Sequence, residues 1–325
     1  MEEKAMFINT WNQKKRSMCR FGFAIIASVM VFAGFYQSAF AADAKQKSFR
    51  SPEEAVKTLI DAVKGNNAKE LLTIFGPEGK ELISSGDEVA DQAGRDRFVK
   101  AYEEMNKLVN ENDKKVILHV GSEGWPFPIP VVKKGEYWFF DTKAGKEEIL
   151  NRRIGRNELN AIQVCLAYVD AQREYVLKDQ DGDKLLEYAQ KFVSKKGEKD
   201  GLYWEAREGE EQSPLGPLVA KAAKEGYTGK KSGDKPSPYH GYYYKILKTQ
   251  GKNAPGGEYD YMVKGKMIGG FALVAYPAEY GNSGIMTFIV NHDGVVYEKD
   301  LGKDTEKITT AMKKFDLDRI WKKVE

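Results

Sequence analysis

The sequence predicts an α+β fold in which helices and a small antiparallel sheet come first, a long linking helix follows, and an antiparallel meander packed on a helix forms the C-terminal part. Three observations predict it. Residues 51–110 carry apolar residues at the spacing of amphipathic helices. Residues 146–177 continue that spacing without a proline. Residues 269–301 contain β-branched and aromatic runs separated by turn residues.

Residues 1–41 have the composition of a secretory signal peptide. A basic segment precedes the apolar run 21–36, and Ala39-Phe40-Ala41 forms an A-x-A cleavage site. The alternative is an uncleaved membrane anchor, but the apolar run is shorter than the roughly 20 residues that span a bilayer. We therefore expect a bacterial protein, periplasmic or secreted through a Sec-type signal, that begins near Ala42 with a polar tether over residues 42–50 and has no transmembrane anchor.

Loss of the signal peptide removes the chain's net charge and one of its two cysteines. The full sequence has 51 Lys and Arg against 48 Asp and Glu, and removal of five basic and two acidic residues leaves 46 of each sign. This balance does not favour nucleic acid as a partner. Cys165 is the cysteine that remains, so no intramolecular disulfide is expected. It lies in an apolar helical face, which favours a packed thiol over a nucleophile.

The first predicted domain, residues 51–145, opens with helices. Ser51-Pro52-Glu53-Glu54 is typical of a helix start, because serine caps the helix and proline fits its first turn. Gly65-Asn66-Asn67 ends this helix, a second is expected over residues 68–75, and a third over residues 94–110. Three short strands are then predicted at residues 115–120, 128–133 and 137–140.

The opening segment SPEEAVKTLIDAVKGNNAKELLTIF resembles the start of cone-shaped folds of the nuclear-transport-factor-2 kind. Such cones often hold a ligand or an active site in the hollow of their sheet. The resemblance implies that Trp125, Trp138 and His119 line a hollow of this kind. The alternative is that these aromatic side chains belong to the core.

The linking helix over residues 146–177 leads to a second predicted domain, residues 178–325. Its Glu147-Glu148 and Arg152-Arg153 pairs are interpreted as a surface ladder of ion pairs. In the second domain we expect an apolar helix over residues 185–192 and a last amphipathic helix over residues 305–321. Strands are predicted at residues 242–247, 259–263, 271–276, 285–290 and 295–298, with a hairpin turn at Asn291-His292-Asp293-Gly294.

Asp179, Asp181 and Asp183 place three carboxylates at alternate positions in a short loop. Carboxylates that converge in this way can bind calcium. The loop differs from an EF-hand, since its glycine comes at the fourth position and Lys184 stands at the sixth. The other interpretation is a solvated turn that caps a helix. Calcium is the one cofactor that the sequence indicates.

Standard catalytic motifs are missing from the sequence. There is no G-x-S-x-G, no glycine-rich phosphate loop and no H-E-x-x-H. One cysteine and scattered histidines do not favour a structural zinc site. His240 lies among tyrosines, and we select His240, Tyr242 and Tyr244 as candidate ligand-binding residues, the alternative being a structural role. No catalytic residue is assigned.

Several blocks of sequence resemble bacterial exported proteins grouped as domain of unknown function 2950. They include ILNRRIGRNELNAIQVCLAYVDAQREY, SPLGPLVA, PYHGYYYKIL, GGFALVAYPAEYGNSGIMTFIV and GVVYEKDLG. The resemblance covers nearly all of the chain after the signal peptide and implies export, but it brings no reaction, cofactor or ligand. The order AYVDAQREY, YHGYYYKI, FALVAYPAEYGNSGIMTFIV is also similar to the globular head of type IV pilins and pseudopilins. Pilins begin with an apolar assembly helix, whereas the first domain takes that place here.

Two function classes follow. The first is a non-enzymatic envelope protein that binds a partner or ligand, which the missing motifs favour. The second is a periplasmic enzyme whose active site is built from residues far apart in the sequence. A concave pocket with a perturbed acid or base would favour the enzyme, and an aromatic patch around residues 242–244 would favour binding.

Overall fold

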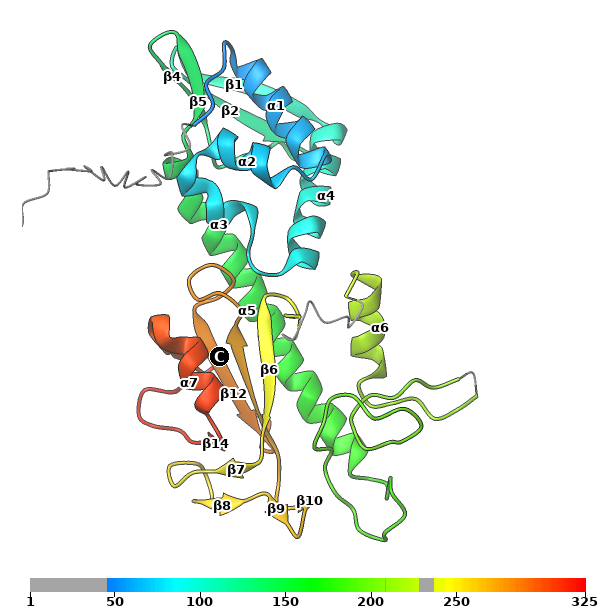
Figure 1. Ribbon diagram of the computed structural model, residues 1–325. Coiled ribbons are helices and arrows are strands. Elements are labelled where there is room, and N and C mark those ends of the chain that lie inside the picture. Colours follow the sequence, from blue (N-terminus) through cyan, green and yellow to red (C-terminus); the bar gives the residue numbers. More distant parts are fainter. Residues whose placement is uncertain (1–45, 208, 228–236) are drawn as a thin grey trace, which may run out of the picture. The chain divides into compact units, whose positions relative to one another are not determined.

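Helices and antiparallel sheets alternate along the chain in the computed structural model, which describes residues 46–207, 209–227 and 237–325 (Figure 1). The mixed α+β class is thereby confirmed. The predicted signal peptide, residues 1–41, lies outside the described residues. Among the helices that are described, none is both long and apolar enough to cross a bilayer.

The first part of the chain contains four helices and a five-stranded sheet. The helical elements are α1 (Pro52–Lys64), α2 (Ala68–Phe75), the short 3-10 turn η1 (Pro77–Gly79), α3 (Lys80–Ile83) and α4 (Glu88–Glu104). The strands are β1 (Asn106–Asn112), β2 (Lys115–Val120), β3 (Trp125–Pro126), β4 (Val131–Lys134) and β5 (Tyr137–Phe140). They follow the order β1-β2-β4-β5, with β3 paired to β2, and every pair is antiparallel.

Helix α1 begins where the sequence predicts. The Ser51 side chain accepts the N–H of Glu54 at 3.2 Å, and Pro52 occupies the first turn. The apolar face of the helix, which includes Leu59, is buried together with Phe140 and the inward residues of β2 in the first core. In β2 buried and half-buried residues alternate, as expected of a strand with one face on a core.

The predicted helix over residues 94–110 is wrong in its second half. Helix α4 starts earlier, capped by the Asp87 side chain on the Ala90 N–H at 3.0 Å, and ends at Glu104. Met105 is extended, and Leu108 and Val109 then pair with β2 in strand β1. These apolar residues fit a helical face and a strand about equally well, and pairing with β2 satisfies their backbone groups.

Helix α5 (Thr142–Tyr175) is the longest element described and closely matches the predicted linking helix. Near its start Gly145 packs on the backbone of Pro128 from the first part of the chain. Its later residues, among them Tyr168, are buried in a second core and pack on the strands of the C-terminal sheet (Figure 1). One helix therefore contributes to both clusters of buried side chains.

The C-terminal sheet has the order β15-β13-β12-β11-β6. The strands of this part are β6 (Tyr242–Leu247), β7 (Thr249–Gln250), β8 (Tyr259–Asp260), β9 (Met262–Val263), β10 (Lys266–Met267), β11 (Ala272–Pro277), β12 (Met286–Asn291), β13 (Val296–Asp300), β14 (Lys314–Phe315) and β15 (Lys322–Lys323). The predicted antiparallel meander is confirmed in β11, β12 and β13. Gly294, with φ of 80°, supplies the positive φ of the predicted turn.

The predicted helix over residues 185–192 does not form. The N–H and the carbonyl of Ala189 bond to the Gln172 side chain at 2.9 and 2.8 Å, and the N–H of Tyr188 bonds to Met267. These backbone groups are thus satisfied by α5 and β10 and not by a helical neighbour. Two further helices complete the fold, α6 (Gly216–Lys224) and α7 (Thr305–Ala311), with the 3-10 turn η2 (Gly302–Asp304) before α7.

The predicted last helix over residues 305–321 is also shorter than expected. Helix α7 stops at Ala311, and Met312 is extended. The Lys245 ammonium donates to the carbonyls of Thr310 and Met312 at 3.0 and 2.7 Å, so a side chain satisfies the end of the helix. Phe315 then enters the core from strand β14, fully buried.

Candidate ligand-binding cavity

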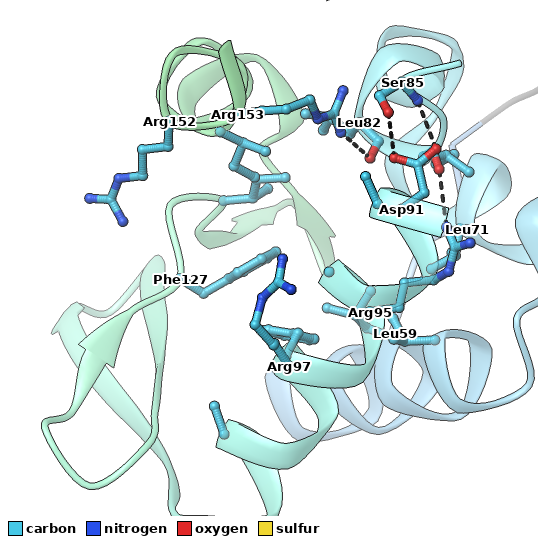
Figure 2. Close-up of a pocket in the computed structure, with 18 of the residues that line it drawn as sticks. Leu59, Leu71, Leu82, Ser85, Asp91, Arg95, Arg97, Phe127, Arg152 and Arg153 are labelled. Atoms are coloured by element: carbon cyan, nitrogen blue, oxygen red, sulfur yellow. Dashed lines mark hydrogen bonds between the residues drawn. The ribbon is translucent and has the colours of Figure 1, made fainter. Parts of the chain in front are cut away.

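A cavity of about 410 Å³ lies within the first part of the chain, between helices α1, α2, α4 and α5 and the sheet (Figure 2). Its interior is mainly apolar. Lining residues include Leu59 of α1, Leu71 of α2, Phe98 of α4, Val120 of β2 and Phe127. Small-molecule sites typically have volumes of about 300–1,000 Å³ and linings of this character.

Helix α4 explains why the cavity stays open. Of its described residues none is buried, although Phe98 and Ala101 lie on one apolar stripe. The stripe therefore packs partly against the first core and partly lines the cavity. Gly94, one turn before Phe98, has only the tip of Arg97 within 4 Å of the place where a Cβ would lie. The wall that α4 presents is consequently thin at this point.

Charged residues on the lining are almost all arginines. Arg95 and Arg97 come from α4, and Arg152, Arg153 and Arg156 come from α5. The one carboxylate on the lining is Asp91, which accepts the N–H of Ser85 at 2.9 Å and its hydroxyl at 2.7 Å (Figure 2). The cavity thus combines an apolar interior with a strong excess of positive charge.

Three of these arginines have partners within the protein. The Arg152 Nε lies 2.6 Å from Glu148, and its guanidinium stacks on Trp125. Arg95 donates to the carbonyl of Ile83 at 3.2 Å, while its buried Nε has no partner among the described residues. Arg152 points away from the other labelled arginines in Figure 2. The predicted Glu148–Arg152 part of the surface ladder is present.

Arg153 ties the cavity to the C-terminal part of the chain. It donates to the carbonyls of Glu81 and Leu82 at 2.6 and 3.0 Å and to the side chain of Asn282. Burial lowers the pKa of its guanidinium from the ordinary value, and Asp91 acts in the opposite direction. Arg153 therefore holds the C-terminal end of α3 in place.

Arg97 and Arg156 differ from the other three. In the part of the chain that the structure describes, neither has an ion pair or a hydrogen bond to a protein acceptor, and both are exposed. Partial burial and the neighbouring charge of Arg97 both lower the pKa of Arg156. The two guanidinium groups thus approach each other from α4 and α5 with no described protein anion between them.

Of the aromatic residues predicted to line a hollow, Trp125 lines this cavity. His119 and Trp138 are not among its lining residues. The His119 ring lies 2.9 Å from the carbonyl of Gly124, and the backbone of Trp138 pairs with Phe49. Sequence reasoning did not find the arginines as a group, because they lie on two separate helices and one pair resembled an ordinary surface ladder.

The residues predicted to bind a ligand, His240, Tyr242 and Tyr244, all lie in the C-terminal part of the chain but in different environments. Tyr242 is fully buried, and its hydroxyl donates to the carbonyl of Met286 at 2.9 Å. The Tyr244 hydroxyl donates to the carbonyl of Tyr239 at 3.4 Å. His240 stands apart from both, in a turn with φ of 51°, and its Nε2 lies 3.2 Å from Glu225 without the alignment of a hydrogen bond. A ligand role for these residues stays a prediction.

The three aspartates predicted to bind calcium do converge. Oxygen atoms of Asp179, Asp181 and Asp183 lie within 4.8 Å of one another. A protein cation already faces them, since the Lys266 ammonium bonds to Asp181 and lies 2.7 Å from Asp183. Asp179 accepts the N–H groups of Gly182 and Lys184, each at 2.8 Å, and the latter bond lowers the pKa of its carboxyl. The cluster therefore combines the side-chain hydrogen bonds of a turn with the converging carboxylates of a cation site.

Together the fold and the cavity define an α+β protein with an arginine-lined apolar chamber. The chain belongs to the family described as Protein of unknown function (DUF2950), whose model matches residues 46–324. The resemblance to domain of unknown function 2950 is thereby confirmed. No curated protein and no solved structure matches the chain.

Proposed function

We propose that the protein is an exported binding protein of the bacterial envelope whose cavity takes up a small molecule with an apolar body. The observation that supports this most directly is helix α4, which turns an apolar stripe toward an open cavity and buries none of its described residues. The apolar side chains of this stripe are half-buried, and a ligand with an apolar body would cover the surface that they still expose to water.

A binding role is supported over an enzymatic one by the chemistry of the lining. In the described part of the chain, the cavity is lined by no histidine, cysteine or lysine. Ser85 and Asp91 bond to each other, but the same carboxylate also accepts the Ser85 N–H, as expected of a group that fixes a loop. Catalytic serines need a base that can take up and return a proton, which a carboxylate engaged in this way does not supply.

Export and fold likeness are part of the same proposal. The signal peptide over residues 1–41 would place the protein in the periplasm or outside the cell, and a cleaved signal would leave no membrane anchor. The likeness of residues 51–75 to cone-shaped folds agrees with a ligand in the hollow beside the sheet. The pilin-like order of the C-terminal segments concerns the head alone and offers no assembly helix.

Binding of a neutral apolar fluorophore such as N-phenyl-1-naphthylamine tests this function. The protein starting at Ala42 should raise the fluorescence with a saturable titration. Gly94→Leu should fill the cavity and weaken binding at least tenfold, because its Cβ has room and leucine suits a helix. Gly155→Leu is the matched control, since nothing lies within 4 Å of its Cβ position. Equal binding by wild type and Gly94→Leu, or no saturable binding, would contradict the proposal.

A further inference from the structure

We propose that the ligand is an amphipathic anion and that Arg97 and Arg156 hold its oxyanion headgroup, a carboxylate or a phosphate. This inference rests on the proposed function, since it specifies the head of a ligand whose apolar body occupies the cavity. The two arginines would sit at the opening of the cavity, where their exposure allows a charged headgroup to remain near water.

The charge balance of the lining supports an anion. Glu148 pairs with Arg152, which leaves four arginines against the one carboxylate on the lining, Asp91, and Ser85 already engages that carboxylate. Uncompensated positive charge next to apolar surface is unfavourable, because the charges repel and lose part of their hydration. A bound anion would remove both costs, whereas a neutral or cationic ligand would remove neither.

The contacts of the five lining arginines single out Arg97 and Arg156 as the pair that is free to bind an anion. Arg95, Arg152 and Arg153 donate to or pair with protein groups, so their guanidinium groups are already oriented. Arg97 reaches from α4 to the side of Phe127 (Figure 2), and Arg156 lines the cavity from helix α5. Planar guanidinium forks from two helices suit a carboxylate or a phosphate, whose oxygen atoms arginine binds through paired hydrogen bonds.

The apolar residues beside the pair define the rest of the ligand. Phe127 and Phe98 stack against each other with ring centroids 5.2 Å apart, and both line the cavity. A polar molecule of the size of a sugar phosphate would leave this surface uncovered. The combination favours an anion with a hydrocarbon chain or ring, such as a fatty acid or an alkyl phosphate.

Isothermal titration calorimetry of the protein starting at Ala42 can test the headgroup. The probes are dodecanoate, dodecyl phosphate, dodecanol and dodecyltrimethylammonium, each below its micellar concentration. We expect the better of the two anions to bind at least tenfold more tightly than the alcohol, with affinity that falls as salt rises, and the cation to bind most weakly. The tighter of the two anions identifies the headgroup.

Substitutions of the arginines test which of them bind the headgroup. Arg97→Gln and Arg156→Gln should each weaken binding of the preferred anion by roughly tenfold or more, as expected for hydrogen bonds between charged groups, and leave dodecanol binding unchanged. Arg152→Gln is the matched control, because Arg152 is paired with Glu148 and stacked on Trp125. It should bind the anion like wild type.

The outcomes separate the two proposals. If dodecanol binds as tightly as both anions, or if Arg97→Gln and Arg156→Gln leave anion binding unchanged, the headgroup inference is overturned while the cavity remains a binding site. If none of the four probes binds to the wild-type protein, the proposed function itself fails and the inference with it.

Discussion

The hydroxyl of Tyr227 donates to the carboxylate of Asp87 at 2.9 Å, although 140 residues separate them. The same carboxylate oxygen accepts the N–H of Gly241 at 2.8 Å, and the other oxygen caps helix α4 through Ala90. Asp87 is buried. One side chain therefore fixes the start of the helix that lines the cavity and joins it to the C-terminal part of the chain.

Replacing Asp87 should destabilise the protein in a measurable way. In Asp87→Asn an amide NH2 can face the Gly241 N–H and the Tyr227 hydroxyl, so at least one buried donor loses its acceptor. We expect a loss of about 1–3 kcal/mol in the free energy of unfolding, measured by urea denaturation. Tyr227→Phe should cost a similar amount, because the Tyr227 hydroxyl also accepts the His240 N–H.

Tyr243→Phe is the control for these two variants. In the described part of the chain no hydrogen bond is made by the Tyr243 hydroxyl, and its ring packs on Tyr276 at 5.7 Å between centroids. The free energy of unfolding should stay within about 0.5 kcal/mol of wild type. A stable Asp87→Asn protein would show that this carboxylate does not join the two parts.

His240 predicts how stability depends on pH. Burial lowers the pKa of its imidazole from the ordinary value, and Lys221 and Arg156 act in the same direction, whereas Glu225 and Asp87 oppose them. Below the unfolded pKa of about 6.5 the unfolded chain takes up a proton that the folded protein resists. Stability should therefore be full above about pH 6.5 and fall as the pH decreases below it.

His240→Asn isolates this effect. Asparagine tolerates the positive φ of 51° at this position, and it does not titrate. Urea midpoints between pH 7.5 and 5.5, values chosen to lie about one unit on either side of the ordinary histidine pKa, should fall less steeply in the variant than in wild type. Parallel curves for the two proteins would mean that the folded state does not hold this imidazole neutral.

Two glycines of helix α5 should respond in opposite directions to alanine. A Cβ on Gly145 would lie 2.3 Å from the carbonyl oxygen of Pro128, so Gly145→Ala must push the helix away from backbone atoms and should cost about 1–3 kcal/mol. Gly155 has nothing within 4 Å, and Gly155→Ala should stabilise by about 1 kcal/mol through helix propensity. Thermal unfolding of both variants checks this, and a shared sign of the two effects would refute it.

Lys266 should compete with calcium for the aspartate cluster. Its ammonium lies 2.7 Å from Asp183 and 3.0 Å from Glu187, and hydrogen bonds to Asp181, then to Asp183 and Glu187, raise its pKa. We expect Lys266→Gln to show a larger rise of its thermal midpoint between chelator and millimolar calcium than wild type. Adding Asp181→Asn should abolish the rise. The absence of any calcium effect in Lys266→Gln would favour the turn interpretation.

Local patterns in the sequence were sufficient for much of the fold. The cap at Ser51 and the Asp293-Gly294 turn depend on neighbours along the chain, and both are found as expected. Leu108 and Val109 were misassigned because their spacing fits two periods, and only the partner strand decides between them. Residues 185–192 were misassigned because Gln172 and Met267, which lie outside the segment, supply hydrogen bonds to Ala189 and Tyr188.

The cavity was beyond the reach of such patterns. A periodic apolar stripe such as that of Phe98 and Ala101 predicts a face turned inward, but it does not reveal whether neighbouring side chains fill the space opposite. Arg97 and Arg156 belong to different helices, and the interaction of their charges depends on how the whole fold places α4 and α5. The sequence of neither helix alone therefore predicts that Arg97 and Arg156 line the same cavity.

Helix α5 also limits how the family can diverge. Each helical residue turns the chain by about 100°, so one inserted or deleted residue between Arg156 and Tyr168 would swing either the guanidinium out of the cavity or the phenol out of the C-terminal core. Loops can gain and lose residues freely, but this interval cannot. We expect homologues across residues 46–324 to differ in composition here while the number of residues from 156 to 168 stays fixed.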